Sequence, residues 1–274
     1  MYKLIACDLD ETLLQTDKHV SQKNIEAIQK ARELGVKFIL ATGRGYLSAQ
    51  NTLKELGLDN QEGEYIISYN GGCITENKGN KILSFNGITW DQAQALYERG
   101  KPYDVCIHVY TKENVYVYRF WPEEADYLNG RMVVEETQEE DLDFLKGQDI
   151  SKMLYVNTDR DYLQQIEQDL QDITQDLDVS YSSNRYIEFN RKGVNKGAGL
   201  LELAQLLGIK PEETIAIGDN FNDLSMIQAA GLGVGVQNAV EGMREQCDYI
   251  TTANHNESAI AEVIEKFILV PEEL

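Results

Sequence analysis

The chain has 274 residues, of which 42% are hydrophobic, and it carries a formal net charge of −21 at pH 7. This length is sufficient for one large domain or for two ordinary ones with substantial cores. Nucleic acids and anionic membranes are not expected as partners, because both bind basic surfaces. No apolar run approaches the roughly 18 residues of a membrane span, and we expect no secretory signal after Met1.

Four cysteines are scattered along the chain, with no Cys-x-x-Cys pair and no histidine at the spacing of a metal site. A disulfide framework and a zinc site are therefore not expected, and the pattern is typical of free thiols in a reducing cytosol. We accordingly expect a cytoplasmic protein, and the sequence indicates no oligomeric state. The cysteines are Cys7, Cys73, Cys106 and Cys247.

The first apolar run, Leu4 to Cys7, stops at Asp8 and Asp10. Such a run followed by polar residues predicts a buried parallel strand, and ligands of α/β sheets bind just beyond the carboxyl ends of strands. Alternate residues of an extended chain face the same way, so the two carboxylates could converge. At about 4 Å they would repel by roughly 4 kcal/mol at an effective dielectric near 20, which a proton or a cation such as Mg2+ would relieve.

Three further Asp-x-Asp pairs lie in polar stretches that no apolar strand precedes. We expect them on solvated helix faces or in turns, because the bare pattern carries no chemistry without a strand end. They are Asp141/Asp143, Asp159/Asp161 and Asp176/Asp178.

The chain divides into two patterns of elements. Residues 1–83 alternate apolar strands with amphipathic helices, which predicts a parallel, right-handed, doubly wound sheet, and this pattern returns over residues 191–274. Residues 84–190 instead contain strands joined by short turns, which predicts an antiparallel sheet in an inserted α+β domain. We interpret Asn70-Gly71-Gly72 as the turn that leads into it. The expected elements are strand 4–7, helix 21–33, strand 36–41, helix 46–56, strand 65–68, helix 91–99, strands 105–110 and 115–120, helix 139–145, strand 153–157, helix 162–175, strands 179–182 and 186–189, helix 196–207, strand 214–217, helix 224–230, strands 233–236 and 249–251, and helix 257–268.

Reactive side chains follow four of these strand or helix ends. One strand end offers a hydroxyl and backbone amides at a strand-to-helix turn, which is a phosphate-binding arrangement. A lysine opens one helix, and two more carboxylates follow a later strand. Carboxylates, a hydroxyl and a lysine together suit phosphoryl transfer, which needs positioning and charge neutralisation. The four pieces are Asp8-Leu9-Asp10-Glu11-Thr12, Thr42-Gly43-Arg44, Lys196, and Gly218-Asp219-Asn220-Phe221-Asn222-Asp223.

In this order the four pieces resemble the motifs of the haloacid dehalogenase-like (HAD) superfamily. Ala41-Thr42-Gly43-Arg44, Asn70-Gly71-Gly72 and Gly193-Val194-Asn195-Lys196-Gly197 are similar to its Cof-like phosphatases. The resemblance covers the whole chain and implies a Rossmann-like core with an α/β cap inserted between the third core strand and the third motif. It also implies a Mg2+-dependent phosphatase of small phosphorylated metabolites such as sugar phosphates. The alternatives are a phosphomutase and a non-catalytic phospho-ligand sensor on the same fold.

The resemblance further implies a role for each motif residue. Asp8 attacks phosphorus and forms an aspartyl-phosphate, and Asp10 protonates the leaving oxygen and then activates water. Mg2+ is bound by Asp8, Asp219 and the backbone carbonyl of Asp10, with Asp223 supporting the metal or the lysine. The phosphoryl oxygens are bound by the Leu9 amide, Thr42, the Gly43 amide, Lys196 and Asn222.

Glu11 stands where the family usually has glycine. It is expected to stiffen the turn after Asp8 and to add a negative charge near the site. Four residues are candidates for substrate contacts. The alternative for Arg44 is an ion pair with a carboxylate, and the favoured alternative for the others is packing on the surface of the inserted sheet. These candidates are Arg44, His108, Arg119 and Arg185.

Overall fold

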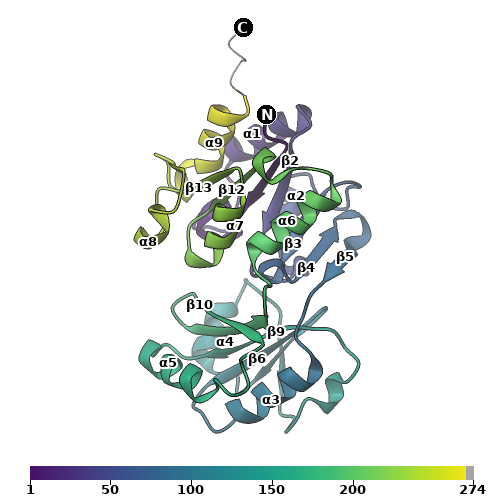
Figure 1. The fold of residues 1–274 in the computed structure, drawn as a ribbon, viewed down its shortest axis with the longest axis vertical. Coiled ribbons are helices and arrows are strands. Elements are labelled where there is room, and N and C mark those ends of the chain that lie inside the picture. Colours follow the sequence, from purple (N-terminus) through teal and green to yellow (C-terminus); the bar gives the residue numbers. More distant parts are fainter. Residues whose placement is uncertain (270–274) are drawn as a thin grey trace. The chain divides into compact units, whose positions relative to one another are not determined.

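The computed structural model describes residues 1–269, which form two compact units (Figure 1). Among the described residues, one unit, the core, contains Met1–Ser84 and residues 195–269, and the other, the cap, contains Phe85–Val194. The chain returns to the core later than residue 191, where the sequence analysis placed the boundary, because the last cap strand continues to Arg191. No helix among the described residues is long and apolar enough to span a membrane.

The core contains an eight-stranded sheet in the order β14-β13-β12-β1-β2-β3-β4-β5. β1 lies between β12 and β2 and is parallel to both, with Cys7 opposite Ile217 on one side and Leu40 on the other. The carboxyl ends of these central strands therefore meet at one edge of the sheet. The strands are β1 (Leu4–Cys7), β2 (Lys37–Ala41), β3 (Tyr65–Ser68), β4 (Cys73–Glu76), β5 (Lys81–Phe85), β12 (Thr214–Gly218), β13 (Leu232–Gly235) and β14 (Tyr249–Ile250).

The sequence analysis predicted a parallel sheet, but the core sheet is mixed. β4 pairs antiparallel with β3, with Tyr65 opposite Glu76, and β5 follows it at the edge of the sheet. Asn70-Gly71-Gly72 therefore turns the chain into β4 rather than directly into the cap. β5 is half exposed along its length and carries polar residues, so it lacks the apolar run by which the central strands were predicted.

Helices cover both faces of the core sheet. On one face α6 and α7 pack against β3 and β12, where Ile67, Leu200, Ala216 and Met226 belong to one buried apolar cluster. α1 packs against β2 and α9, and Ser21 caps its first turn. The predicted helix over residues 46–56 is a 3-10 turn followed by the short α2. The helices are α1 (Gln22–Glu33), α2 (Gln50–Glu55), α6 (Lys196–Leu206), α7 (Leu224–Ala229), α8 (Glu241–Arg244) and α9 (Ala259–Phe267).

The cap contains a six-stranded sheet in the order β10-β11-β9-β6-β7-β8. Its neighbours are antiparallel except β7 and β8, and α3 and α5 pack against one face around Ile107, Tyr155 and Phe189. The α/β core and the α+β cap were both predicted from the sequence. The cap elements are α3 (Trp90–Gly100), β6 (Cys106–Thr111), β7 (Val115–Tyr118), α4 (Pro122–Leu128), β8 (Glu135–Thr137), β9 (Ile150–Val156), α5 (Arg160–Asp169), β10 (Leu177–Ser182) and β11 (Tyr186–Arg191).

The predicted helix over residues 139–145 was wrong, since only a 3-10 turn, Asp143–Leu145, forms there. Contacts with α3 occupy the backbone groups that a helix would use. The Leu142 N–H donates to Gln94 Oε1 at 2.8 Å, and the Glu139 carbonyl accepts the Tyr97 hydroxyl at 2.7 Å. Tertiary contacts have overridden local helix propensity in this segment.

Both tryptophans of the chain belong to the cap. Trp90 opens α3, is half-buried against the apolar cluster of the cap, and donates its indole N–H to the Leu142 carbonyl at 2.9 Å. Trp121 precedes Pro122 at the start of α4.

Candidate active site

Two acidic residues follow neighbouring strands at the carboxyl edge of the core sheet. Asp8 comes directly after β1, and Asp219 comes directly after β12. The two strands are parallel neighbours, and the Asp8 N–H donates to the Ile217 carbonyl at 2.9 Å. Asp8 is 7% exposed and Asp219 is 5% exposed. Strand pairing therefore brings together two buried carboxylates that are far apart in the sequence.

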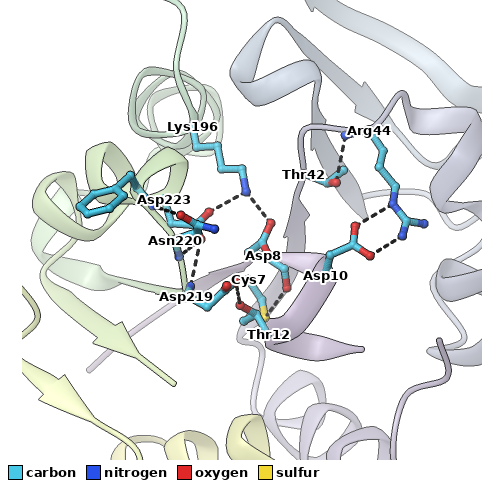
Figure 2. Close-up of polar contacts among 11 residues, drawn as sticks. Cys7, Asp8, Asp10, Thr12, Thr42, Arg44, Lys196, Asp219, Asn220 and Asp223 are labelled. Carbon is cyan, nitrogen blue, oxygen red and sulfur yellow. Dashed lines mark hydrogen bonds and ion pairs between the residues drawn. The ribbon is translucent and has the colours of Figure 1, made fainter. Parts of the chain in front are cut away.

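A lysine joins these carboxylates from the first turn of α6. Asn195 caps this helix by accepting the Ala198 N–H, so Lys196 is its first residue. The Lys196 side chain has no exposed surface. Its Nζ donates to Asp8 Oδ1 and, at 2.6 Å, to Asp223 Oδ1 (Figure 2). A single buried ammonium therefore links the strand β1 end to the loop after β12.

Asp223 has hydrogen-bond donors on both of its oxygens. Oδ1 accepts from Lys196, while Oδ2 accepts the backbone N–H groups of Asp219 at 3.0 Å and Asn220 at 3.1 Å. Gly218 makes room for this carboxylate, because a Cβ at that position would lie 2.5 Å from the Asp223 side chain. Asp223 therefore positions the lysine and the loop more directly than it could bind a cation.

The carboxylates of Asp8, Asp219 and Asp223 form a buried group in which one oxygen of each lies within 4.8 Å of the others. Thr12 orients this group by donating its hydroxyl to Asp219 Oδ1 at 2.7 Å. Within residues 1–269, the Oδ2 atoms of Asp8 and Asp219 receive no hydrogen bond. Two unbonded carboxylate oxygens in an all-oxygen donor set fit a hard divalent cation.

Burial and mutual repulsion shift the pKa values in this group. Burial, followed by the charge of Asp223, raises the pKa of Asp8 well above its ordinary value. The same two causes, partly offset by the Thr12 hydrogen bond, raise the pKa of Asp219 to about 7. Burial lowers the pKa of Lys196, but the ion pairs with Asp223 and Asp8 outweigh burial, so the pKa of Lys196 is raised. The group therefore lacks positive charge, which a divalent cation would supply.

The turn after Asp8, Leu9–Leu13, is closed like a π-helical turn by the Leu14 N–H, which donates to the Leu9 carbonyl at 2.9 Å, but Asp10 and Glu11 have non-helical backbone angles. Within it Glu11 has a φ of 59°, in the left-handed region that favours glycine. This is the position where the resemblance led us to expect glycine. Asn238 holds the strained turn by donating its side-chain N–H to the Glu11 carbonyl at 2.8 Å. The sequence analysis did not identify Asn238, and the only signal for it is a polar residue soon after the end of β13.

The Asp10 side chain points to Arg44 rather than into the buried carboxylate group (Figure 2). Arg44 Nε donates to Asp10 Oδ2 at 2.8 Å, and Nη2 donates to Oδ1. Lys18 Nζ lies 3.6 Å from the same Oδ1. Thr42 is buried after β2, and its hydroxyl accepts the Arg44 N–H at 3.1 Å. Of the two alternatives for Arg44, pairing with a carboxylate describes its contacts here.

The other residues expected to bind phosphate lie at the same strand ends. Leu9 is buried in the π-helical turn, and Gly43 is partly exposed next to Thr42. Asn222 is partly exposed in the 3-10 turn Phe221–Asp223. Their contacts with phosphate stay a prediction.

The three cap candidates make contacts within the cap itself. His108 is fully buried on β6, where burial lowers its pKa to about 3, and its Nε2 lies 3.6 Å from Glu124 Oε1. Arg185 Nη1 donates to Glu124 Oε2 at 2.9 Å. Arg119 is exposed and donates to the Tyr103 carbonyl at 2.7 Å. Packing on the cap sheet describes these contacts, and a role in binding substrate stays a prediction.

Comparisons with known proteins agree with the four motifs. Residues 5–264 match the family model of haloacid dehalogenase-like hydrolases. The 5-amino-6-(5-phospho-D-ribitylamino)uracil phosphatase YcsE of Bacillus subtilis is 31% identical over 268 residues, which cover 97% of this chain and 96% of that protein. The HMP-PP phosphatase of Serratia proteamaculans is 28% identical over 275 residues, covering 99% of this chain and 97% of that protein.

Solved structures also match the whole chain. The crystal structure of a haloacid dehalogenase-like hydrolase from Bacteroides thetaiotaomicron superposes with a TM-score of 0.84 at 32% identity, covering 97% of this chain and 99% of that one. This agreement confirms the Rossmann-like core with a cap. The chain therefore belongs to the haloacid dehalogenase-like hydrolase family, and it is a phosphoric monoester hydrolase.

Proposed function

We propose that this chain is a Mg2+-dependent phosphatase that hydrolyses small phosphorylated metabolites through an aspartyl-phosphate on Asp8. The observation that carries the proposal is the buried group in which Lys196 binds Asp8 and Asp223 while Oδ2 of Asp8 and Oδ2 of Asp219 receive no hydrogen bond. A nucleophile, a fixed cation and a metal-binding edge at one strand end are what phosphoryl transfer requires.

In the proposed reaction a carboxylate oxygen of Asp8 forms a bond to phosphorus, and the bond from phosphorus to the leaving oxygen breaks with its electron pair. Asp10 gives its proton to that oxygen. In the second half, water gives a proton to Asp10 and its oxygen bonds to phosphorus. The bond between phosphorus and Asp8 then breaks, which restores the carboxylate and releases inorganic phosphate.

The phosphoryl group needs hydrogen-bond donors for its oxygens during both half-reactions. We assign these contacts to the Lys196 ammonium, the Thr42 hydroxyl, the amides of Leu9 and Gly43, and the Asn222 side chain. Lys196 is suited to this task because burial strengthens its interaction with an anion, and because Asp223 keeps it fixed.

The metal would be held by the free carboxylate oxygens of Asp8 and Asp219, with the Asp10 carbonyl as a further ligand. When bound, Mg2+ would neutralise negative charge on the phosphoryl group and orient it toward Asp8. The buried carboxylates, with one oxygen of each within 4.8 Å of the others, support a cation at this place. Asp223, whose oxygens are occupied, would act through Lys196.

The names of the relatives support small phosphate esters as substrates. The Bacillus subtilis relative is named for a phosphorylated ribitylaminouracil, and the Serratia proteamaculans relative for HMP-PP. The four free cysteines are consistent with the reducing cytosol in which such metabolites occur. We include no macromolecular partner in the proposal, since the charge of −21 disfavours polyanions.

The test is phosphate release from a panel of sugar phosphates, nucleoside monophosphates and the phosphorylated ribityl pyrimidine. Each substrate is assayed with Mg2+ and with chelator, for the native chain, Asp8→Asn and the control Asp176→Asn. Asp176 is an exposed member of a second Asp-x-Asp pair, so its loss should leave turnover unchanged. Mg2+-dependent turnover that disappears only in Asp8→Asn is the expected result. A folded, metal-loaded protein without turnover would instead favour the phosphomutase or the phospho-ligand sensor.

A further inference from the structure

The position of Arg44 in the chain is fixed by backbone contacts on both sides. Its N–H donates to the Thr42 hydroxyl at 3.1 Å, and its carbonyl accepts the Tyr69 N–H at 3.0 Å. Gly45 follows directly, and a Cβ there would lie 2.5 Å from the Tyr69 hydroxyl. The guanidinium therefore extends from a backbone that has little freedom to move.

The guanidinium binds both oxygens of one carboxylate. Arg44 Nε and Nη2 donate to Oδ2 and Oδ1 of Asp10, which is the bidentate geometry that a planar guanidinium provides and a lysine ammonium does not. The Arg44 side chain is 20% exposed and the Asp10 side chain 39%. Lys18 contributes a weaker contact at 3.6 Å from Oδ1.

Asp10 has few other constraints on its side chain. It lies in the kinked part of the π-helical turn, with φ −78° and ψ 131°, and it is partly open to solvent. Because 39% of the Asp10 side chain is exposed, the carboxylate would sample several rotamers without the guanidinium. The orientation of the proposed acid–base group therefore depends on Arg44.

We propose that Arg44 is a positioning residue that orients the Asp10 carboxylate for proton transfer and does not itself bind substrate. The inference rests on the proposed function, in which Asp10 donates a proton to the leaving oxygen as the bond from phosphorus to that oxygen breaks. Nε and Nη2 each donate to Asp10, so binding this carboxylate already fixes the direction of the guanidinium plane.

The test compares substrates that differ in how much their leaving group needs a proton. A sugar phosphate leaves as an alkoxide and needs the proton of Asp10, whereas p-nitrophenyl phosphate leaves as a stable phenolate. If Arg44 acts through Asp10, Arg44→Gln lowers kcat/KM for the sugar phosphate by about 10- to 100-fold, since misplaced catalytic groups cost this much. The loss for p-nitrophenyl phosphate is less than about 3-fold. Arg44→Lys behaves like Arg44→Gln, because an ammonium cannot form the bidentate contact.

Two further variants separate orientation from folding. Asp10→Asn combined with Arg44→Gln should be no slower than Asp10→Asn alone, because both changes remove the same step. Arg32 forms a half-buried fork on a single oxygen of Glu64, the residue before β3, with Nε donating to Oε1 at 3.3 Å and Nη2 donating to the same Oε1 at 2.9 Å. Arg32→Gln controls for the loss of such a fork and should leave kcat/KM unchanged for both substrates.

The outcomes distinguish this inference from the proposed function. Equal losses for both substrates, with a raised KM, would mean that Arg44 binds the phosphate, and would overturn the inference while the phosphatase stands. Additive losses in the double variant would overturn it as well. If the native chain releases phosphate from neither substrate, the proposed function falls and the inference falls with it.

Discussion

Replacing Lys196 with methionine removes the buried ammonium that binds Asp8 and Asp223 while nearly preserving side-chain volume. One carboxylate oxygen each of Asp8, Asp219 and Asp223 lies within 4.8 Å of the other two. Two unit charges at that separation repel by about 3.5 kcal/mol at an effective dielectric of 20. Removing one partner of a buried ion pair costs a similar amount, roughly 3–5 kcal/mol. We therefore expect Lys196→Met to lower the free energy of unfolding by about 3–5 kcal/mol at pH 8.

This loss should depend on pH in a definite direction. Burial and the charge of Asp223 raise the folded-state pKa of Asp219 to about 7, above its ordinary value of 3.8. A carboxyl group with a raised pKa binds protons more tightly in the folded state, so stability falls as pH rises through this window. Without Lys196 the effect grows, and the destabilisation should shrink as pH falls from 8 toward 5.

Urea unfolding followed by circular dichroism, at pH 5 and pH 8 and with or without Mg2+, measures this difference. Lys37→Met is the matched control, because Lys37 Nζ donates to the Gly63 carbonyl and its loss exposes no carboxylate pair. Bound Mg2+ should restore part of the stability of Lys196→Met at pH 8. A loss of the same size at both pH values, or one no larger than that of Lys37→Met, would refute the charge argument.

Three further outcomes follow from the structure. Glu11→Gly should raise the free energy of unfolding by about 0.5–1 kcal/mol by relieving a φ of 59°, whereas Glu11→Ala should not, and urea titration distinguishes them. Burial holds the pKa of His108 near 3, so the unfolded state binds the extra proton below pH 6.5 and stability is lost as pH falls; the cost is roughly 2 kcal/mol at pH 5. His108→Phe should abolish this acid sensitivity in unfolding followed by tryptophan fluorescence, and an unchanged pH profile would contradict the assignment. Thr12→Val removes the hydroxyl that binds Asp219 Oδ1 at 2.7 Å and should weaken Mg2+ binding by about 10- to 100-fold in calorimetric titrations.

The central strands and the residues at their ends could be predicted because one pattern specifies both. An apolar run that stops at Asp8, Thr42 or Asp219 encodes a buried strand together with a polar group at its carboxyl end. Parallel pairing then brings those groups to one edge, whichever sequence lies between them. The order of the four motifs indicated the family, and the match of the family model to residues 5–264 confirmed it.

Side-chain partners could not be predicted in the same way. Nothing in the spacing of Asp10 and Arg44 indicates that they form a bidentate pair, because the contact depends on the exact turn that each strand end makes. The half-exposed β5 was missed for lack of an apolar run. Asn238 was missed because it donates to a backbone carbonyl, and a single polar residue in a loop does not indicate such a contact.

The confinement of Trp90 and Trp121 to the cap has a spectroscopic consequence. When tryptophan is excited selectively, the emission comes from residues within 85–194, because the core that carries Asp8 contains no tryptophan. A change in emission when phosphate or Mg2+ is added would therefore be a response sensed by the cap, recorded without any label. The native chain thus contains an intrinsic fluorescent probe in the cap and none in the core.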